Sequence, residues 1–133
     1  MHAAKLLFYK DDHSNNASLA VFDFPTLIGK MKSKNSWVKG DLDTMILLRT
    51  PAKQIVLAAL HGGTKITSFQ SGESITFQII EGKMKFHLRR ESVNLGQGQL
   101  LTLGEHQKYS MSTDQETVLL LTITTSSVKL SEN

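Results

Sequence analysis

Short stretches in which apolar and polar residues alternate, separated by glycine-rich turns, extend from about residue 38 to residue 124. In Lys83–Arg89 the alternation puts Met84, Phe86 and Leu88 on one face, as expected for a strand with one buried side. Similar apolar or alternating stretches are Met45–Arg49, Gln54–Leu60, Ile75–Ile79, Leu100–Leu103 and Thr117–Ile123. The turns between them are His61–Gly63, Glu81–Lys83 and Gly96–Gly98. Many short strands joined in this way predict an all-β barrel or sandwich.

The first forty residues follow a different pattern. Pro25–Lys32 carries apolar residues at Leu27, Ile28 and Met31, a spacing that predicts one short amphipathic helix with proline near its start. Trp37 follows in a connector rich in Lys, Ser and Asn, and we expect it to pack the helix onto the barrel.

The chain of 133 residues has the length of one structural domain. We expect an N-terminal arm and short helix over 1–38, a barrel over 39–125 and a C-terminal tail over 126–133. The absence of cysteine excludes disulfides, thiol nucleophiles and thiolate metal sites, and it fits a cytoplasmic protein. No apolar run is long enough to span a bilayer, so we expect no membrane association.

The net charge of +3 is weak evidence for binding to nucleic acid. Residues 1–40 hold six Lys against three Asp, whereas residues 41–133 hold nine basic and nine acidic residues. Because nucleic-acid binding normally needs a clustered basic face, we expect no nucleic-acid partner. Lys83, Lys85, Arg89 and Arg90 could form an anion patch, but Glu81 and Glu91 flank them and favour a solvated outer face.

Two segments of the chain resemble the paired motifs of the cupin superfamily. The first, Gly63–Gly82, leads through an apolar strand to a Glu-Gly turn, and the second, Gly98–Tyr109, has a glycine, an apolar strand and a further turn. The resemblance covers residues 42–124 and is to small single-domain cupins of the RmlC-like, cupin 2 type. It implies a double-stranded β-helix, which is a jelly-roll barrel, preceded here by the short N-terminal helix.

The residues at the metal-binding positions of that motif depart from the cupin pattern. By the resemblance, Phe69 and Ser71 stand where two His ligands would be, Ile75 stands at the acidic position, and Tyr109 stands at the remaining His. Phenyl and alkyl groups cannot replace imidazole or carboxylate ligands, and neutral hydroxyls bind such metals poorly. We therefore expect no metal and no other cofactor.

Strand alternation also predicts which side chains line the barrel. The expected ligand-binding residues are Thr67, Phe69, Ser71, Ile75, Phe77, Tyr109 and Met111, with Met45 and Leu47 as candidates from an earlier strand. Apolar walls with a few hydroxyls suit a small-molecule site, but they equally suit a barrel filled by its own side chains, and the sequence leaves both open. Tyr109 could hold a ligand, act as a general acid, or be an ordinary core tyrosine.

Three functions remain for such a barrel. The first is a metal-free module that binds or senses a small, apolar molecule and is not an enzyme. The second is a metal-independent isomerase or lyase with Tyr109 as the acid, for which His106 is the one plausible base. The third is a structural barrel with a filled core that acts as a homodimer, the commonest assembly of such proteins. His61, before Gly62 and Gly63, reads as a turn residue, and His87 should point away from the barrel interior.

Overall fold

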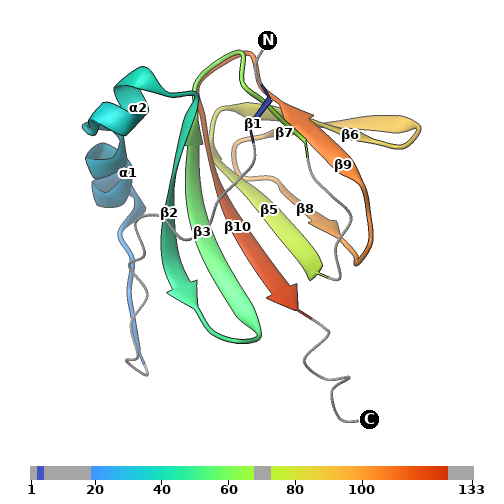
Figure 1. Ribbon diagram of the computed structural model, residues 1–133, viewed down its shortest axis with the longest axis horizontal. Coiled ribbons are helices and arrows are strands. Elements are labelled where there is room, and N and C mark those ends of the chain that lie inside the picture. Colours follow the sequence, from blue (N-terminus) through green and yellow to red (C-terminus); the bar gives the residue numbers. More distant parts are fainter. Residues whose placement is uncertain (1–2, 5–18, 68–72, 126–133) are drawn as a thin grey trace.

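Two five-stranded β-sheets make up most of the computed structural model, which describes residues 3–4, 19–67 and 73–125 (Figure 1). The first sheet has the order β1-β4-β9-β6-β7 and the second has the order β2-β3-β10-β5-β8. The first sheet contains β1 (Ala3–Ala4), β4 (Lys65–Thr67), β6 (Lys83–Leu88), β7 (Glu91–Gly96) and β9 (Tyr109–Ser112). The second contains β2 (Leu42–Arg49), β3 (Lys53–Leu60), β5 (Glu73–Glu81), β8 (Leu100–Leu103) and β10 (Thr117–Thr125).

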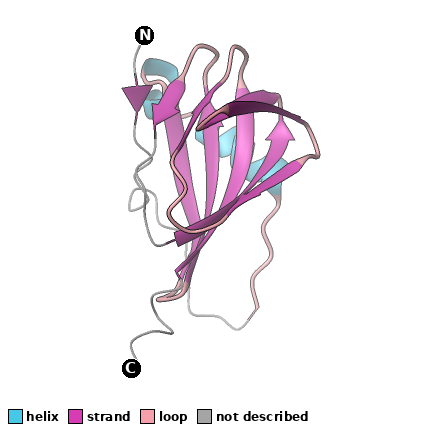
Figure 2. Cartoon of the chain, turned by 90° about the vertical axis from the view of Figure 1, so that its right-hand side faces the viewer, coloured by secondary structure: helices cyan, strands magenta, loops and turns pink. Residues whose placement is uncertain are grey.

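The two sheets face each other and enclose the main core (Figure 2). Every pairing is antiparallel except that of β1 with β4, which is parallel. β10 lies between β3 and β5, so the sheet order departs from the sequence order in the manner of a jelly roll. The predicted all-β fold is confirmed, and so is the alternation over Lys83–Arg89, because Met84 and Phe86 are buried in the core.

The main core consists of the inward residues of both sheets. Its fully buried members include Phe77, Phe86, Ile79, Met84 and Met111. Partly buried residues close this core toward one end of the barrel, among them Ile75, Leu101, Leu103, Val93 and Tyr109. These positions alternate with outward ones along each strand, because successive side chains of a strand point to opposite faces of the sheet.

A second core lies between the other face of the β2-β3-β10 part of the sheet and two helices, α1 (Phe24–Lys32) and α2 (Asn35–Lys39) (Figure 1). Trp37 is buried here, as expected, and so are Ile28 and Met31. Met45 and Leu47 belong to this core as well. Their proposed place in the barrel lining is therefore wrong, because β2 is buried on both faces and its inward residue is Ile46.

The N-terminal region differs from the sequence prediction in two further respects. The single expected helix is followed by the second, five-residue helix α2, so Trp37 lies in a helix and not in a connector. Ala3–Ala4 forms the short edge strand β1 beside β4, whereas no strand was expected in the N-terminal arm.

Candidate functional site

The centre of the barrel, which the sequence left open as either a ligand site or a filled core, holds packed aromatic side chains. Phe77 packs edge-on against Phe86, with ring centroids 4.8 Å apart, and against Tyr109 at 5.3 Å. Phe77 and Met111 are fully buried, whereas Ile75 and Tyr109 are partly buried at the margin of the same core. Four of the predicted lining residues are thus brought together, and they pack against one another.

The remaining three predicted residues lie elsewhere. Thr67 is exposed, and its partner in the register is Ser110 on β9, while the neighbouring residue Ile66 is the one that enters the core. Its expected inward orientation is wrong, because β4 has the opposite phase to that extrapolated from Phe69. Phe69 and Ser71 lie outside the residues that the structure describes.

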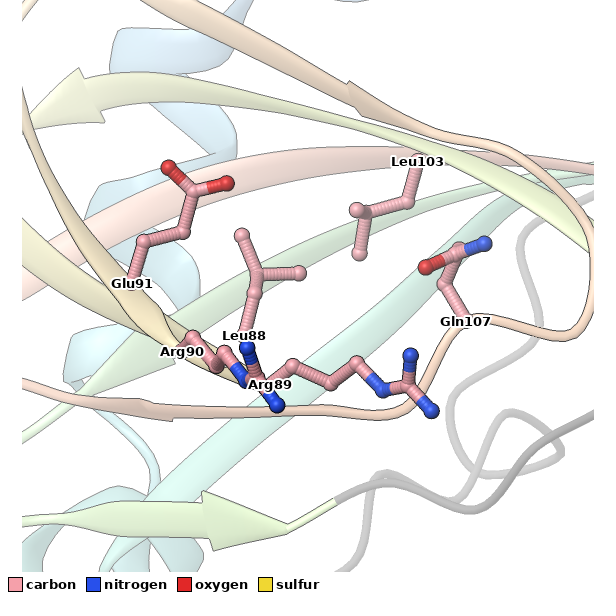
Figure 3. A pocket seen from close by; sticks show the side chains of 6 residues that line it. All are labelled: Leu88, Arg89, Arg90, Glu91, Leu103 and Gln107. Carbon is pink, nitrogen blue, oxygen red and sulfur yellow. The ribbon is translucent and has the colours of Figure 1, made fainter.

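An open pocket of about 1000 Å³ lies at the end of the barrel where β6 turns into β7 (Figure 3). Its lining residues are Leu88, Arg89, Arg90, Glu91, Leu103 and Gln107. We call it the open-end pocket. It adjoins the aromatic core, because Leu88 pairs with Tyr109 in the register and Leu103 pairs with Ile75.

The open-end pocket combines an apolar floor with a charged rim. The side chains of Leu88 and Leu103 extend into the same space, and Arg89 reaches across it toward Gln107 (Figure 3). Glu91 lies on the opposite side from Gln107. Among the described residues, Arg89 and Arg90 form no ion pair within the pocket, so their guanidinium groups are available for an anionic group of a ligand.

The residues at the cupin metal position do not fit a metal ion. Ile75 offers an alkyl group, and the Tyr109 ring packs on Phe77 within the apolar core. In the described part of the chain, no three His, Cys, Asp or Glu side chains are grouped closely enough to hold a metal ion. We therefore derive no chemistry through a metal.

The rim of the open-end pocket was missed by the sequence analysis, which assigned Arg89 and Arg90 to a solvated face. One signal was present: the alternation of Met84 and Phe86 continues to Leu88, so an inward residue stands directly before the two arginines. Leu103 and Gln107 line the pocket because the ends of particular strands lie side by side, and the spacing of residues in the sequence does not predict which strand ends these are.

His106, the one base considered for an enzymatic barrel, is exposed on the turn before β9, where its backbone has a φ of 62°. It does not line the open-end pocket. His87 points to the outer face of its sheet, as predicted, since its register partners are Ser92 and Ser110 and not the core residues.

No helix in the described part of the chain is long and apolar enough to cross a membrane. No family model matches the sequence, and no curated protein matches it either. The fold, in contrast, has many counterparts among solved structures.

Three of these structures illustrate the similarity. The cupin domain of Cnp3 from Schizosaccharomyces pombe has a TM-score of 0.64 and 13% identity, over 71% of this chain and 72% of that domain. A cupin-2 domain protein from Shewanella frigidimarina has a TM-score of 0.63 and 13% identity, over 77% and 92% of the two chains. KdgF from Halomonas sp. has a TM-score of 0.61 and 13% identity, over 70% and 88%.

At these identities the similarity concerns the fold and not the activity. The order of the strands, the pairing of the two sheets and the similarly folded solved structures agree with the motifs in the sequence. This chain has the cupin fold, with other residues at the cupin metal positions.

Proposed function

We propose that the protein is a small-molecule binding or sensing module whose ligand occupies the open-end pocket without a metal ion. The observation that carries this proposal is the juxtaposition of an apolar floor, Leu88 and Leu103, with Arg89 and Arg90 free of ion pairs among the described residues. Concave sites with apolar walls and a few charged groups are typical of ligand pockets.

The composition of the pocket also indicates the class of ligand. A purely apolar molecule would leave two guanidinium groups of the rim without a partner. We infer an amphipathic ligand, with an apolar part on the two leucines and a carboxylate or similar anion on Arg89 or Arg90. Gln107 and Glu91 supply further polar groups for its orientation.

A thermal-shift screen of small organic acids with apolar chains tests this proposal, because a ligand that binds only the native state raises the melting temperature. The matched variants are Leu103→Ser, which alters the pocket floor, and Leu100→Ser, on the opposite face of the same strand, where the side chain is 54% exposed. We expect the shift to be lost in the first variant, retained in the second, and unaffected by a chelator. A screen without any stabilising acid would contradict the proposal.

The alternative of an isomerase or lyase gains less support. Its acid, Tyr109, packs on Phe77, and its base, His106, is exposed and does not line the open-end pocket. A general base must come within hydrogen-bond reach of the proton that it removes.

A homodimer remains the second proposal, supported by the outer face of the β10-β5-β8 part of its sheet. Leu120 and Ile80 pack against the helices, and Glu81 pairs with Lys32. Beyond the helices the outward residues carry no charge: Thr122, Thr124, Ser74, Thr76, Gln78, Leu100 and Thr102. A basic chain can place two copies of such a face together without opposing like charges.

Sedimentation velocity over a range of concentrations tests the dimer. We expect Gln78→Arg, at the centre of the uncharged face, to yield monomers, and Gln97→Arg, on an exposed turn, to leave the dimer intact. A monomeric wild-type protein at high concentration would contradict this proposal and would not affect the one for the open-end pocket.

A further inference from the structure

The outer face of the β4-β9-β6-β7 layer is basic and rich in hydroxyl groups. Strand alternation directs the side chains of Lys65, Lys83, Lys85 and His87 to this face, and the other outward positions of these strands are Ser, Thr, Asn or Gly. No Asp or Glu occupies an outward position on the described residues of these four strands.

The two carboxylates expected to neutralise this face are directed elsewhere. Glu81 is the last residue of β5 in the other sheet, and its Oε1 lies 3.4 Å from Nζ of Lys32 on α1. Glu91 lines the open-end pocket, and in β7 it shares the inward phase of Val93 and Leu95. A further acidic residue, Asp114, lines a separate hollow with Lys85 beyond the far end of β9.

A groove of about 340 Å³ crosses this face beside the β8–β9 connection. Its lining residues are Thr67, His87, Arg89, Lys108, Tyr109 and Ser110. The register places Thr67 beside Ser110 and Ser110 beside His87, so these three stand in one row across β4, β9 and β6. Adjacent strands are about 4.8 Å apart, which brings the three side chains within reach of one small ligand.

The side chains that line the groove are basic or neutral, and neither Asp nor Glu is among the described lining residues. Arg89 and Lys108 form no ion pair with any described residue. The His87 ring is oriented by Ser92 and Ser112, whose Oγ atoms are 3.2 Å from Nδ1 and 3.5 Å from Nε2. Guanidinium, ammonium and hydroxyl donors without a competing carboxylate are the groups that hold a phosphate.

We propose that this outer groove binds the phosphate group of a small molecule, at a site that shares only Arg89 with the open-end pocket. The described outward positions of these strands carry no Phe, Tyr or Trp on which nucleic-acid bases could stack, and no large apolar residue that could enter a membrane. The volume of the groove is near the lower end for small-molecule sites, which favours a compact phosphate compound.

The test is a titration of ¹⁵N-labelled protein with inorganic phosphate, and separately with glycerol phosphate, followed by amide chemical shifts. An ionic strength of about 0.01 M keeps the Debye length near 30 Å, so exposed charges are little screened. We expect saturable shifts concentrated at Thr67, His87 and Ser110. Tighter binding of glycerol phosphate would identify an ester as the ligand, and equal binding would identify free phosphate; both outcomes support the groove.

Lys108 is the residue to alter, because it lines the outer groove and not the open-end pocket. Loss of one charged hydrogen bond should weaken phosphate binding about tenfold in Lys108→Gln, while Lys108→Arg should retain it. Lys30→Gln, on the exposed side of α1, removes the same charge far from the groove and should change the affinity less than twofold.

Three results would overturn the proposal. One is a set of non-saturating shifts spread over all surface lysines. Another is equal weakening by Lys108→Gln and Lys30→Gln. The third is a single-stranded oligonucleotide that binds more tightly than either phosphate compound and shifts the whole length of β6, which would make the face a nucleic-acid surface.

Discussion

The imidazole of His61 stacks on the indole of Trp37, with ring centroids 3.6 Å apart and the planes inclined by 17°. In addition, Nε2 of His61 lies 2.6 Å from the backbone carbonyl oxygen of Trp37. Because a carbonyl only accepts, this nitrogen donates. The pair fastens α2 to the end of β3, so His61 is more than the turn residue that its glycine neighbours suggested.

Substitution of this histidine should loosen the attachment of the helices. We expect His61→Ala to lower the free energy of unfolding by about 1–2 kcal/mol, because both the ring contact and the hydrogen bond are lost. Urea unfolding followed by circular dichroism measures this, and fluorescence of Trp37, the one tryptophan in the chain, reports the contact itself. His87→Ala, on an exposed face, should change the stability by less than about 0.5 kcal/mol; equal losses would contradict the assignment.

The filled interior predicts a large effect at Phe77. Phe77→Ala should cost about 3–5 kcal/mol, because a fully buried ring in contact with Phe86 and Tyr109 is replaced by a cavity. The neighbouring variant Thr76→Ala, on the opposite face of β5, should cost less than about 1 kcal/mol. Chemical denaturation distinguishes the two, and a loss below about 1 kcal/mol for Phe77→Ala would show that the barrel is hollow there.

Two turn glycines allow backbone strain to be separated from close packing. Gly82 and Gly98 both have positive φ, 91° and 86°. A Cβ on Gly82 would lie 2.5 Å from the Glu116 carbonyl oxygen, whereas a Cβ on Gly98 would have nothing within 4 Å.

Gly98→Ala should therefore cost only the backbone penalty of about 1 kcal/mol. Gly82→Ala should cost at least about 2 kcal/mol more, because the β9–β10 turn would have to move. That turn is held by the hydroxyls of Thr113 and Thr117, each 2.8 Å from the Lys83 carbonyl oxygen. Melting temperatures of the two variants under one set of conditions give the comparison; similar values would argue against close packing at Gly82.

The ion pairs of Lys32 predict that the stability of the protein depends on pH. Its Nζ is 2.5 Å from Glu116 Oε2 and 3.4 Å from Glu81 Oε1. Burial acts to lower the pKa of Lys32, but Glu116 first and then Glu81 outweigh it, so the pKa is raised above 10.5. Since the folded pKa exceeds the unfolded one, the stabilisation is complete below pH 10.5 and disappears as the pH rises through the folded pKa.

Lys32→Gln should remove that contribution, which for a partly exposed pair is at most about 1 kcal/mol. We expect the difference in unfolding free energy between wild type and variant to be present at pH 7 and to shrink above pH 10.5 and in about 1 M salt. Denaturation curves at several pH values provide the measurement. A difference that stays constant into the alkaline range would exclude the ion pairs as its source.

The sequence was most informative where a strand has one buried face. Met84 and Phe86 alternate with lysines, and the structure buries both as predicted. The sequence misled at Met45 and Leu47. The helices cover the outer face of β2, so both faces of this strand are apolar and the sequence does not show which residues face the barrel interior. Thr67 was assigned by extrapolation from Phe69, which lies outside the described residues, and the structure shows Thr67 exposed.

The open-end pocket and the outer groove lay beyond sequence reasoning for a different reason. Arg89 and Glu91 stand two positions apart, yet each lines the open-end pocket, and Arg89 also lines the outer groove. A charged residue at a hairpin can line either of two surfaces. The choice depends on which strand ends lie beside the hairpin, and this is determined by the pairing of strands that are distant in the sequence. The identities of Phe69, Ser71, Ile75 and Tyr109 predict that a cupin-type metal centre does not fit, and this stays a prediction, since Phe69 and Ser71 lie outside the described residues.

The central place of β10 governs how the molecule can assemble. The last strand of the barrel pairs with β3 through Leu119 and Ala58, and with β5 through Leu121 and Phe77. Without β10, the sheet would consist of two unconnected strand pairs, the hairpin β2-β3 and the non-consecutive pair β5-β8, with exposed hydrogen-bonding edges. Distant pairings of this kind slow folding, so closure of the barrel awaits synthesis of its final strand, and the nascent chain must keep those edges from pairing with other molecules in the meantime.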